Sequence, residues 1–171
     1  MGHRFYHADR AKSLSVGQTL ALDSNGLSKF GAAYFPYCCY QSPESLTDAQ
    51  LREAVAEYVR LKPKFTHKYP SRGSVLFGAL TVEDAIWHAR NTQPQAVGSF
   101  PVYEVWSEKF FTLDRNWLDF DAPFEQRIRY SFHYLYGQIS NHCPADGQSL
   151  LPPRLEVLIP LPMTIGSIAG Y

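Results

Sequence analysis

Apolar and polar positions alternate near both ends of the chain in the pattern of β-strands. Arg4–His7 predicts a strand close to the N-terminus, and Gln18–Leu22 predicts a second one after a polar connection. Leu155–Ile165 closes the chain with apolar residues at alternate positions, while its prolines at 160 and 162 place the far half at an edge or a bulge. Strands are therefore expected to open and close the fold.

Helical spacing and a short apolar run predict the elements in the middle of the chain. Leu46–Lys62 is the clearest helix, because it carries an apolar stripe and because Thr47 and Gln50 have the spacing of a capping box. Val75–Leu80 has the length of a buried strand. Thr81 follows directly and is expected to cap another helix through its hydroxyl.

Further segments complete the expected order of elements. Val102–Trp106 alternates as a strand, and Phe110–Leu113 is a candidate for another. Asp121 is expected to cap a third helix, with Pro123 in its first turn. Because strands do not alternate regularly with helices, the pattern favours a mixed α+β fold rather than a doubly wound sheet.

Residues 27–45 hold an unusual number of aromatic side chains and are predicted to be irregular, with prolines at 36 and 43. A long ordered loop of this kind often covers a binding site, although plain packing is the alternative. We therefore expect this segment to shape a cleft or to meet a substrate. Its aromatic residues are Phe30, Tyr34, Phe35, Tyr37 and Tyr40.

Composition limits the class of protein. The 171 residues suit a single domain over residues 1–171, and the 16 basic and 16 acidic residues give a formal net charge of +0, with no overall attraction to nucleic acid or membrane. The three cysteines, Cys38, Cys39 and Cys143, lack metal-ligand spacing and suggest a reduced, cytoplasmic protein. We expect no metal, no signal peptide and no membrane span.

Candidate chemistry lies where polar residues stand at the ends of predicted strands. His7 belongs to the first strand, Arg72 and Ser74 precede the central strand, and Glu156 begins the last one. Glu156 should face away from the core and meet solvent or a partner, because a carboxylate beside an apolar run needs one. The alternatives are a core histidine at residue 7 and a solvated loop at residues 71–74.

Three segments together resemble the ADP-ribosyltransferase fold. Tyr6–Gly17 is similar to the Tyr-His start of the bacterial rifampin-modifying and DNA-modifying branches. Val75–Trp87 is similar to the strand and helix of the rifampin-modifying branch. Arg154–Pro160 resembles the strand that carries the catalytic glutamate in many toxins. The resemblance implies an α+β fold in which split mixed or antiparallel sheets form a central NAD cleft flanked by helices.

The resemblance also implies an activity, namely transfer of ADP-ribose from NAD to an acceptor with loss of nicotinamide. Glu156 would stabilise the oxocarbenium-like transition state. His7 would bind a ribose, and Arg10 a phosphate. Phe77 or Tyr103 would stack on nicotinamide. Arg72 and Ser74 would complete the NAD site.

Two departures from the family pattern bear on the acceptor. Arg154 stands where many members carry Glu or Gln, and Leu76–Phe77 stands where many carry Tyr on the central strand. An acceptor other than protein arginine is therefore favoured, and protein, nucleic acid and small molecule all stay open. The setting could be a toxin, an effector delivered into a target cell or a defence protein, with an antitoxin or immunity protein as a partner.

Other functions on the same fold are the alternatives. An enzyme of this kind could hydrolyse NAD or remove an RNA 2′-phosphate. A small partner-binding protein could also keep the fold without the chemistry, with the aromatic segment closing the cleft.

Overall fold

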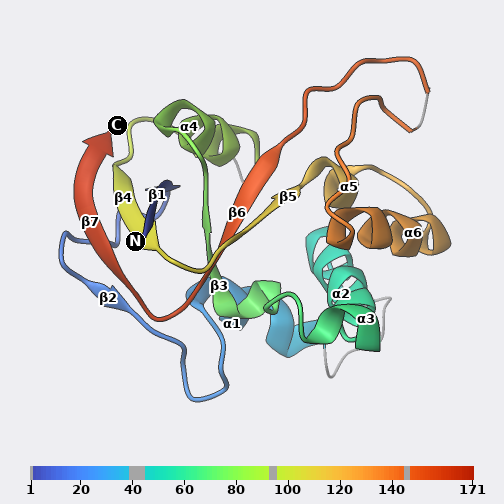
Figure 1. The fold of residues 1–171 in the computed structure, drawn as a ribbon, viewed down its shortest axis with the longest axis horizontal. Coiled ribbons are helices and arrows are strands. Elements are labelled where there is room, and N and C mark those ends of the chain that lie inside the picture. Colours follow the sequence, from blue (N-terminus) through green and yellow to red (C-terminus); the bar gives the residue numbers. More distant parts are fainter. Residues whose placement is uncertain (1, 39–44, 93–95, 145–146) are drawn as a thin grey trace.

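The computed structural model describes residues 2–38, 45–92, 96–144 and 147–171. The described chain is a mixed α+β fold with two antiparallel sheets, which confirms the coarse fold class expected from the sequence. Figure 1 shows the two sheets side by side, with α4 covering one end of the first sheet and the remaining helices gathered around the second.

The first sheet has the strand order β1-β4-β7-β2. Its strands confirm the segments expected near the N-terminus and around residue 104. The first and the last strand of the chain, β1 and β7, both belong to this sheet, and β4 lies between them. The bounds are β1 (His3–Ala8), β2 (Thr19–Leu20), β4 (Val102–Ser107) and β7 (Met163–Gly170).

The second sheet has the order β3-β6-β5, with β3 (Val75–Gly78), β6 (Leu155–Pro160) and β5 (Phe111–Asp114). The far half of the predicted strand Leu155–Ile165, expected at an edge or a bulge, does not continue the same strand, because β6 is the central strand of the second sheet and ends at Pro160. After a turn the chain enters the first sheet as β7.

Both faces of β6 are buried, which corrects the expected exposure of Glu156. Leu158 packs into a core formed with the helices, whereas Val157 and Ile159 pack against the strands of the first sheet. Since β6 lies between two apolar layers, neither face reaches solvent. Glu156 is accordingly only 4% exposed.

The two sheets are joined at one point by backbone hydrogen bonds between Tyr6 and Ala79. Each residue's N–H donates to the other's carbonyl oxygen, at 3.0 and 2.8 Å. Gly78 makes room for this approach, since a Cβ on it would lie 3.1 Å from Ile159 and 3.5 Å from the Tyr6 carbonyl oxygen. The junction places β1 beside the end of β3.

The helices confirm two of the expected caps. Thr47 and Gln50 form the complete capping box of α2, and the Thr81 hydroxyl accepts from the Asp84 N–H at the start of α4. The apolar side of α2 packs with α3, α5, α6 and the second sheet in one core. The bounds are α1 (Lys29–Cys38), α2 (Asp48–Arg60), α3 (Pro63–Thr66), the 3₁₀ turn η2 (Arg72–Ser74), α4 (Val82–Asn91), α5 (Asn116–Asp119) and α6 (Phe124–Leu135).

Two helix predictions are wrong. The segment expected to be irregular forms α1, whose first turn is capped where the Ser28 hydroxyl accepts from the Gly31 N–H at 3.1 Å. α6 begins after Pro123, whose side chain has no polar atom and makes no cap hydrogen bond, while Asp121 is 99% exposed and contacts Arg127 instead. Among the described residues, no helix has the length and apolar character needed to cross a bilayer.

Candidate functional site

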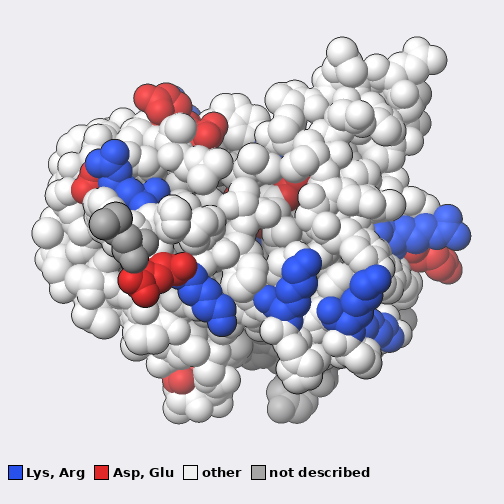
Figure 2. Space-filling model, in the orientation of Figure 1, with Lys and Arg blue, Asp and Glu red and all other residues white. Residues whose placement is uncertain are grey.

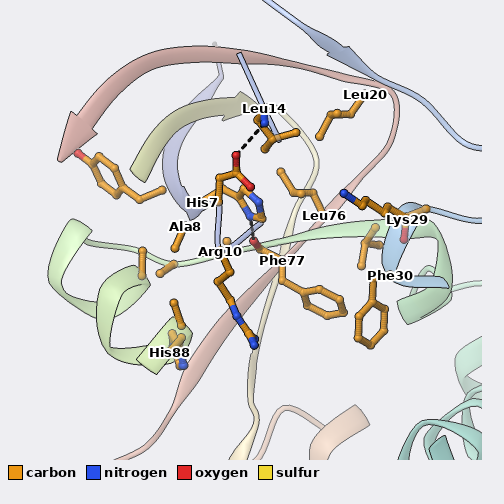
Figure 3. A pocket seen from close by; sticks show the side chains of 18 of the residues that line it. His7, Ala8, Arg10, Leu14, Leu20, Lys29, Phe30, Leu76, Phe77 and His88 are labelled. Atoms are coloured by element: carbon orange, nitrogen blue, oxygen red, sulfur yellow. Dashed lines mark hydrogen bonds between the residues drawn. The ribbon is translucent and has the colours of Figure 1, made fainter. Parts of the chain in front are cut away.

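A cavity of about 450 Å³ lies where β1, the end of β3, α1, α4 and the start of β6 converge (Figure 3). Figure 3 shows Lys29 and Phe30 reaching it from α1, His88 from α4, and Arg10 extending between them. The cavity is lined by β1 and by Val75–Phe77 of β3, but not by residues 71–74, which include the expected site residues Arg72 and Ser74. Its polar lining residues include His7, Asp9, Arg10, Ser13, Ser28, Lys29, His88, Thr92, Arg115 and Glu156.

His7 lines the cavity from β1 and is held by the junction between the sheets. Its Nδ1 lies 2.8 Å from the Phe77 carbonyl oxygen. Because a carbonyl can only accept, Nδ1 carries the hydrogen. Burial lowers the pKa of His7 below its usual 6.5, against the opposing effects of the Phe77 carbonyl and Asp9. The ring is therefore neutral at pH 7, and its Nε2 is a hydrogen-bond acceptor.

Glu156 also lines the cavity, at the start of β6, but its carboxylate is already bound by protein groups. Oε1 accepts from the Tyr134 hydroxyl at 2.7 Å and from Arg72, and Oε2 lies 3.4 Å from Arg115. Burial raises the pKa of Glu156. The effects of Arg72, Arg115 and the hydrogen bonds are larger and opposite, so the pKa is lowered to about 2. Glu156 is thus a fixed negative charge at the cavity wall.

Arg72 lies behind that wall rather than in the cavity. Its guanidinium binds both carboxylate oxygens of Glu53, at 2.7 and 3.1 Å, and also contacts Tyr134 and Glu156. The Phe77 ring lies 4.6 Å from its Cζ and separates it from the cavity side. Arg72 is 3% exposed, so it orders the site from within the core.

Two further residues expected to touch the ligand, Ser74 and Tyr103, are likewise absent from the described cavity lining. The Ser74 hydroxyl donates to the Ser71 carbonyl at 2.9 Å. Tyr103 is 4% exposed and donates to the Leu14 carbonyl at 2.8 Å, on the first sheet. Tyr103 is therefore a core residue that supports the turn carrying Arg10, and Phe77 is the one of the two expected stacking residues that lines the cavity.

Phe30 lines the cavity from α1, as expected for the aromatic segment. Its ring meets Phe77 edge-on, with 4.8 Å between centroids, and stacks on Tyr34 at 4.5 Å. The Phe35 side chain is buried instead and packs against Gly73, where an added Cβ would lie 3.0 Å from the Phe35 ring. The side chains of the remaining aromatics at positions 37 and 40 lie outside the described residues.

The cavity lining also includes Lys29, His88 and Arg115, which no sequence pattern had indicated. His88 Nε2 lies 3.0 Å from the Leu155 carbonyl oxygen, and burial is the main cause that lowers its pKa. Arg115 bridges Glu156 and Asp119, to which its Nε lies at 3.2 Å. The only local signal for Arg115 was its place directly after a strand, where rigid sites are often built.

The arrangement offers an apolar, aromatic-walled cavity with a neutral histidine, basic groups and two buried carboxylates, those of Asp9 and Glu156. Such a mixture of apolar walls and a few placed polar groups suits a small molecule with an anionic part. Among the residues that the structure describes, no group of three His, Cys, Asp or Glu side chains could hold a metal ion. No family model matches the sequence, and no curated protein is significantly similar to it.

Proposed function

We propose that the cavity binds NAD and that the protein is a mono-ADP-ribosyltransferase. The observation that carries this proposal is that His7, from the first sheet, and Glu156, from the second, line one cavity. These are the two residues to which the sequence resemblance assigns ribose binding and catalysis. The size of the cavity, about 450 Å³, lies in the usual range for small-molecule sites.

The cavity residues have chemically suitable roles for such a substrate. The neutral Nε2 of His7 accepts a hydrogen bond from a ribose hydroxyl, and Arg10 and Lys29 supply charge for the pyrophosphate. Phe77 and Phe30 offer aromatic contacts to the nicotinamide ring. All these groups stand on β1, on α1 or beside them, so one ligand can span them.

In the proposed reaction, the bond between the ribose C1′ and the nicotinamide nitrogen breaks, and its electron pair leaves with nicotinamide. The acceptor's nucleophilic atom bonds to C1′ and gives up its proton. Positive charge develops on the ribose in the transition state, and the fixed negative charge of Glu156 stabilises it. Arg72 and Tyr134 position the carboxylate from behind.

The test uses NAD binding and nicotinamide release, measured separately. Calorimetry should detect NAD binding that His7→Ala weakens, and labelled NAD should release nicotinamide with the wild-type protein. Glu156→Gln should slow release by about a hundredfold with NAD affinity little changed, because its charge matters mainly in the transition state. No binding of NAD or of non-hydrolysable analogues at millimolar concentration would refute the proposal.

A second candidate is a protein that binds NAD or a related nucleotide without catalysis. The observation that favours it is the engagement of Glu156 by Arg72, Tyr134 and Arg115, which offsets the carboxylate's charge. Binding of NAD without release of nicotinamide would select this function. Release without transfer to any acceptor would instead indicate NAD hydrolysis.

A further inference from the structure

Basic and aromatic residues gather on a surface away from the cavity lining. The stretch Arg60–Arg72 holds five Lys and Arg residues and no Asp or Glu, although basic and acidic residues are equal over the whole chain. It runs from the last residue of α2, through α3, to the first residue of η2. We define the lysine–tyrosine surface as Leu61, Lys62, Lys64 and Lys68 of this stretch, together with Tyr58 on α2 and Tyr136 after α6.

The three lysines of this surface contact tyrosines. Lys62 Nζ lies 2.9 Å from the Tyr58 hydroxyl, and Lys64 Nζ lies 2.8 Å from the Tyr136 hydroxyl. Lys68 Nζ lies 4.9 Å from the ring centroid of Tyr69. The ammonium groups of Lys62 and Lys64 also lie 4.0 and 4.5 Å from the ring centroids of Tyr58 and Tyr136, and cation–π contacts of this kind hold an ammonium group in place while leaving its charge intact.

The charges of these lysines are not neutralised within the described structure. Arg60 pairs with Glu57 and Arg72 with Glu53, but none of the three lysines forms an ion pair with a carboxylate that the structure describes. Figure 2 shows basic side chains spaced across the lower part of this face, including the region where Figure 1 places α3. The surface therefore attracts anions.

Apolar and aromatic area is exposed between these charges. Tyr58 is 54% exposed, Tyr136 45% and Leu61 58%. Lysines that merely cover apolar surface would explain a single pair. They explain less well two lysines beside exposed tyrosines and a third beside the buried Tyr69, with no ion pair between these lysines and a described carboxylate.

We propose that the lysine–tyrosine surface binds single-stranded nucleic acid. Ammonium groups neutralise backbone phosphates, and exposed tyrosine rings stack with unpaired bases. An acidic peptide or an anionic bilayer would satisfy the lysines but would leave the flat rings without a matching partner. The proposal is independent of the NAD site, because none of these residues lines the cavity.

The test is fluorescence anisotropy with labelled 12-nucleotide single-stranded DNA and RNA, without NAD, over a range of salt concentrations. Binding should weaken with salt, with a log–log slope of about −2 for three phosphate contacts. Lys64→Ala should make that slope shallower by about 0.7, whereas Tyr136→Leu should weaken binding about tenfold with the slope unchanged. Thermal unfolding confirms that each variant is folded.

Lys109→Ala is the matched control, because it removes the same charge from an exposed position between β4 and β5. Equal losses in the Lys64 and Lys109 variants would overturn the proposal and indicate non-specific attraction. Absence of binding at low salt would overturn it as well. Equal affinity for polyglutamate or for vesicles containing anionic lipid would show that the surface selects charge alone and would likewise refute it.

Discussion

Arg72 and Glu156 form a buried ion pair that ties the 3₁₀ turn before β3 to the first residues of β6. Both side chains are at most 5% exposed, so each loses the solvation of its charge on folding. Burial of this kind is tolerated only where every charge is paired and hydrogen-bonded. Glu53 and Tyr134 supply the remaining partners and join α2 and α6 to the same cluster.

The first prediction concerns the stability that depends on Arg72. Arg72→Met leaves Glu53 and Glu156 as two buried carboxylates without their shared cation, so unfolding free energy should fall by about 3–5 kcal/mol. Arg4→Met is the control, since Arg4 pairs with Glu104 at 3.1 Å but its side chain is 51% exposed. It should cost less than about 1 kcal/mol. Urea denaturation of the two variants measures the difference, and similar losses would contradict the structure of the cluster.

The second prediction concerns acid stability. The folded-state pKa of Glu156 is lowered from 4.5 to about 2, so the ionised form stabilises the fold above pH 4.5. That stability is lost as pH falls from 4.5 towards 2, and the shift corresponds to about 3 kcal/mol. Glu156→Gln should be destabilised at pH 7 and should lose less further stability on acidification than wild type.

Denaturation at several pH values between 7 and 3 tests this dependence. Glu125→Gln, on the exposed first turn of α6, is the matched control and should retain the wild-type pH profile. A Glu156→Gln profile that runs parallel to wild type would show that the carboxylate is not held by Arg72 and Arg115 in solution. The same denaturation measurements show how much of any activity lost by Glu156→Gln comes from lower stability rather than from the proposed loss of catalysis.

Local signals predicted part of this structure well. The capping residues Thr47 and Thr81 fix helix starts through contacts three residues away, and these are visible in any sequence. The strand predicted over Arg4–His7 is present as β1, and His7 on this strand lines the cavity.

Long-range packing decided what the sequence did not show. Glu156 was expected to face solvent, but β6 is covered on both faces by layers drawn from distant segments. The partners of Arg72 stand 19 and 84 positions away, at Glu53 and Glu156. Residues 27–45 were expected to be irregular because of their aromatic residues and the prolines at 36 and 43, yet Lys29–Cys38 forms α1, in which a close contact with Gly73 requires Gly31.

That contact gives the third prediction, which concerns the packing of α1 against η2. A Cβ on Gly31 would lie 2.0 Å from the carbonyl oxygen of Gly73, which also accepts from the Ser28 N–H at 2.7 Å. Gly31→Ala must displace α1, so it should lower the unfolding free energy by at least about 3 kcal/mol. Because Phe30 moves with the helix, NAD binding should weaken too.

Gly2→Ala is the control, because its Cβ would lie no closer than 3.7 Å to any other atom. It should leave both stability and binding within the error of the wild-type values. Thermal unfolding and calorimetry with NAD measure the two properties. A stable Gly31→Ala variant would mean that α1 does not approach η2 as closely as described.

The last prediction concerns the pH dependence of ligand binding through His7. Its folded-state pKa lies below 6.5 because the ring is buried, so Nε2 stays unprotonated and able to accept a hydrogen bond at pH 7 and above. NAD affinity should therefore be constant from pH 8 to 7 and should fall as pH drops below 6.5 through the folded-state pKa. His7→Ala should bind NAD about tenfold or more weakly at pH 7, since a hydrogen bond to a buried group contributes about 1–3 kcal/mol.

Acidification should lower the stability of the fold as well as the affinity for NAD, so stability must be measured alongside binding. Between its folded-state pKa and 6.5, the unfolded chain holds more protons on His7 than the folded protein does, so acidification also lowers the unfolding free energy. Calorimetry at pH values where the protein stays folded separates the two effects.

His142→Ala, at an exposed position, is the matched control and should follow the wild-type binding curve. Any pH dependence left in His7→Ala would report His88, which lines the same cavity and whose pKa is also lowered. An unchanged affinity in His7→Ala would remove His7 from the site and leave the cavity's aromatic and basic residues to account for binding.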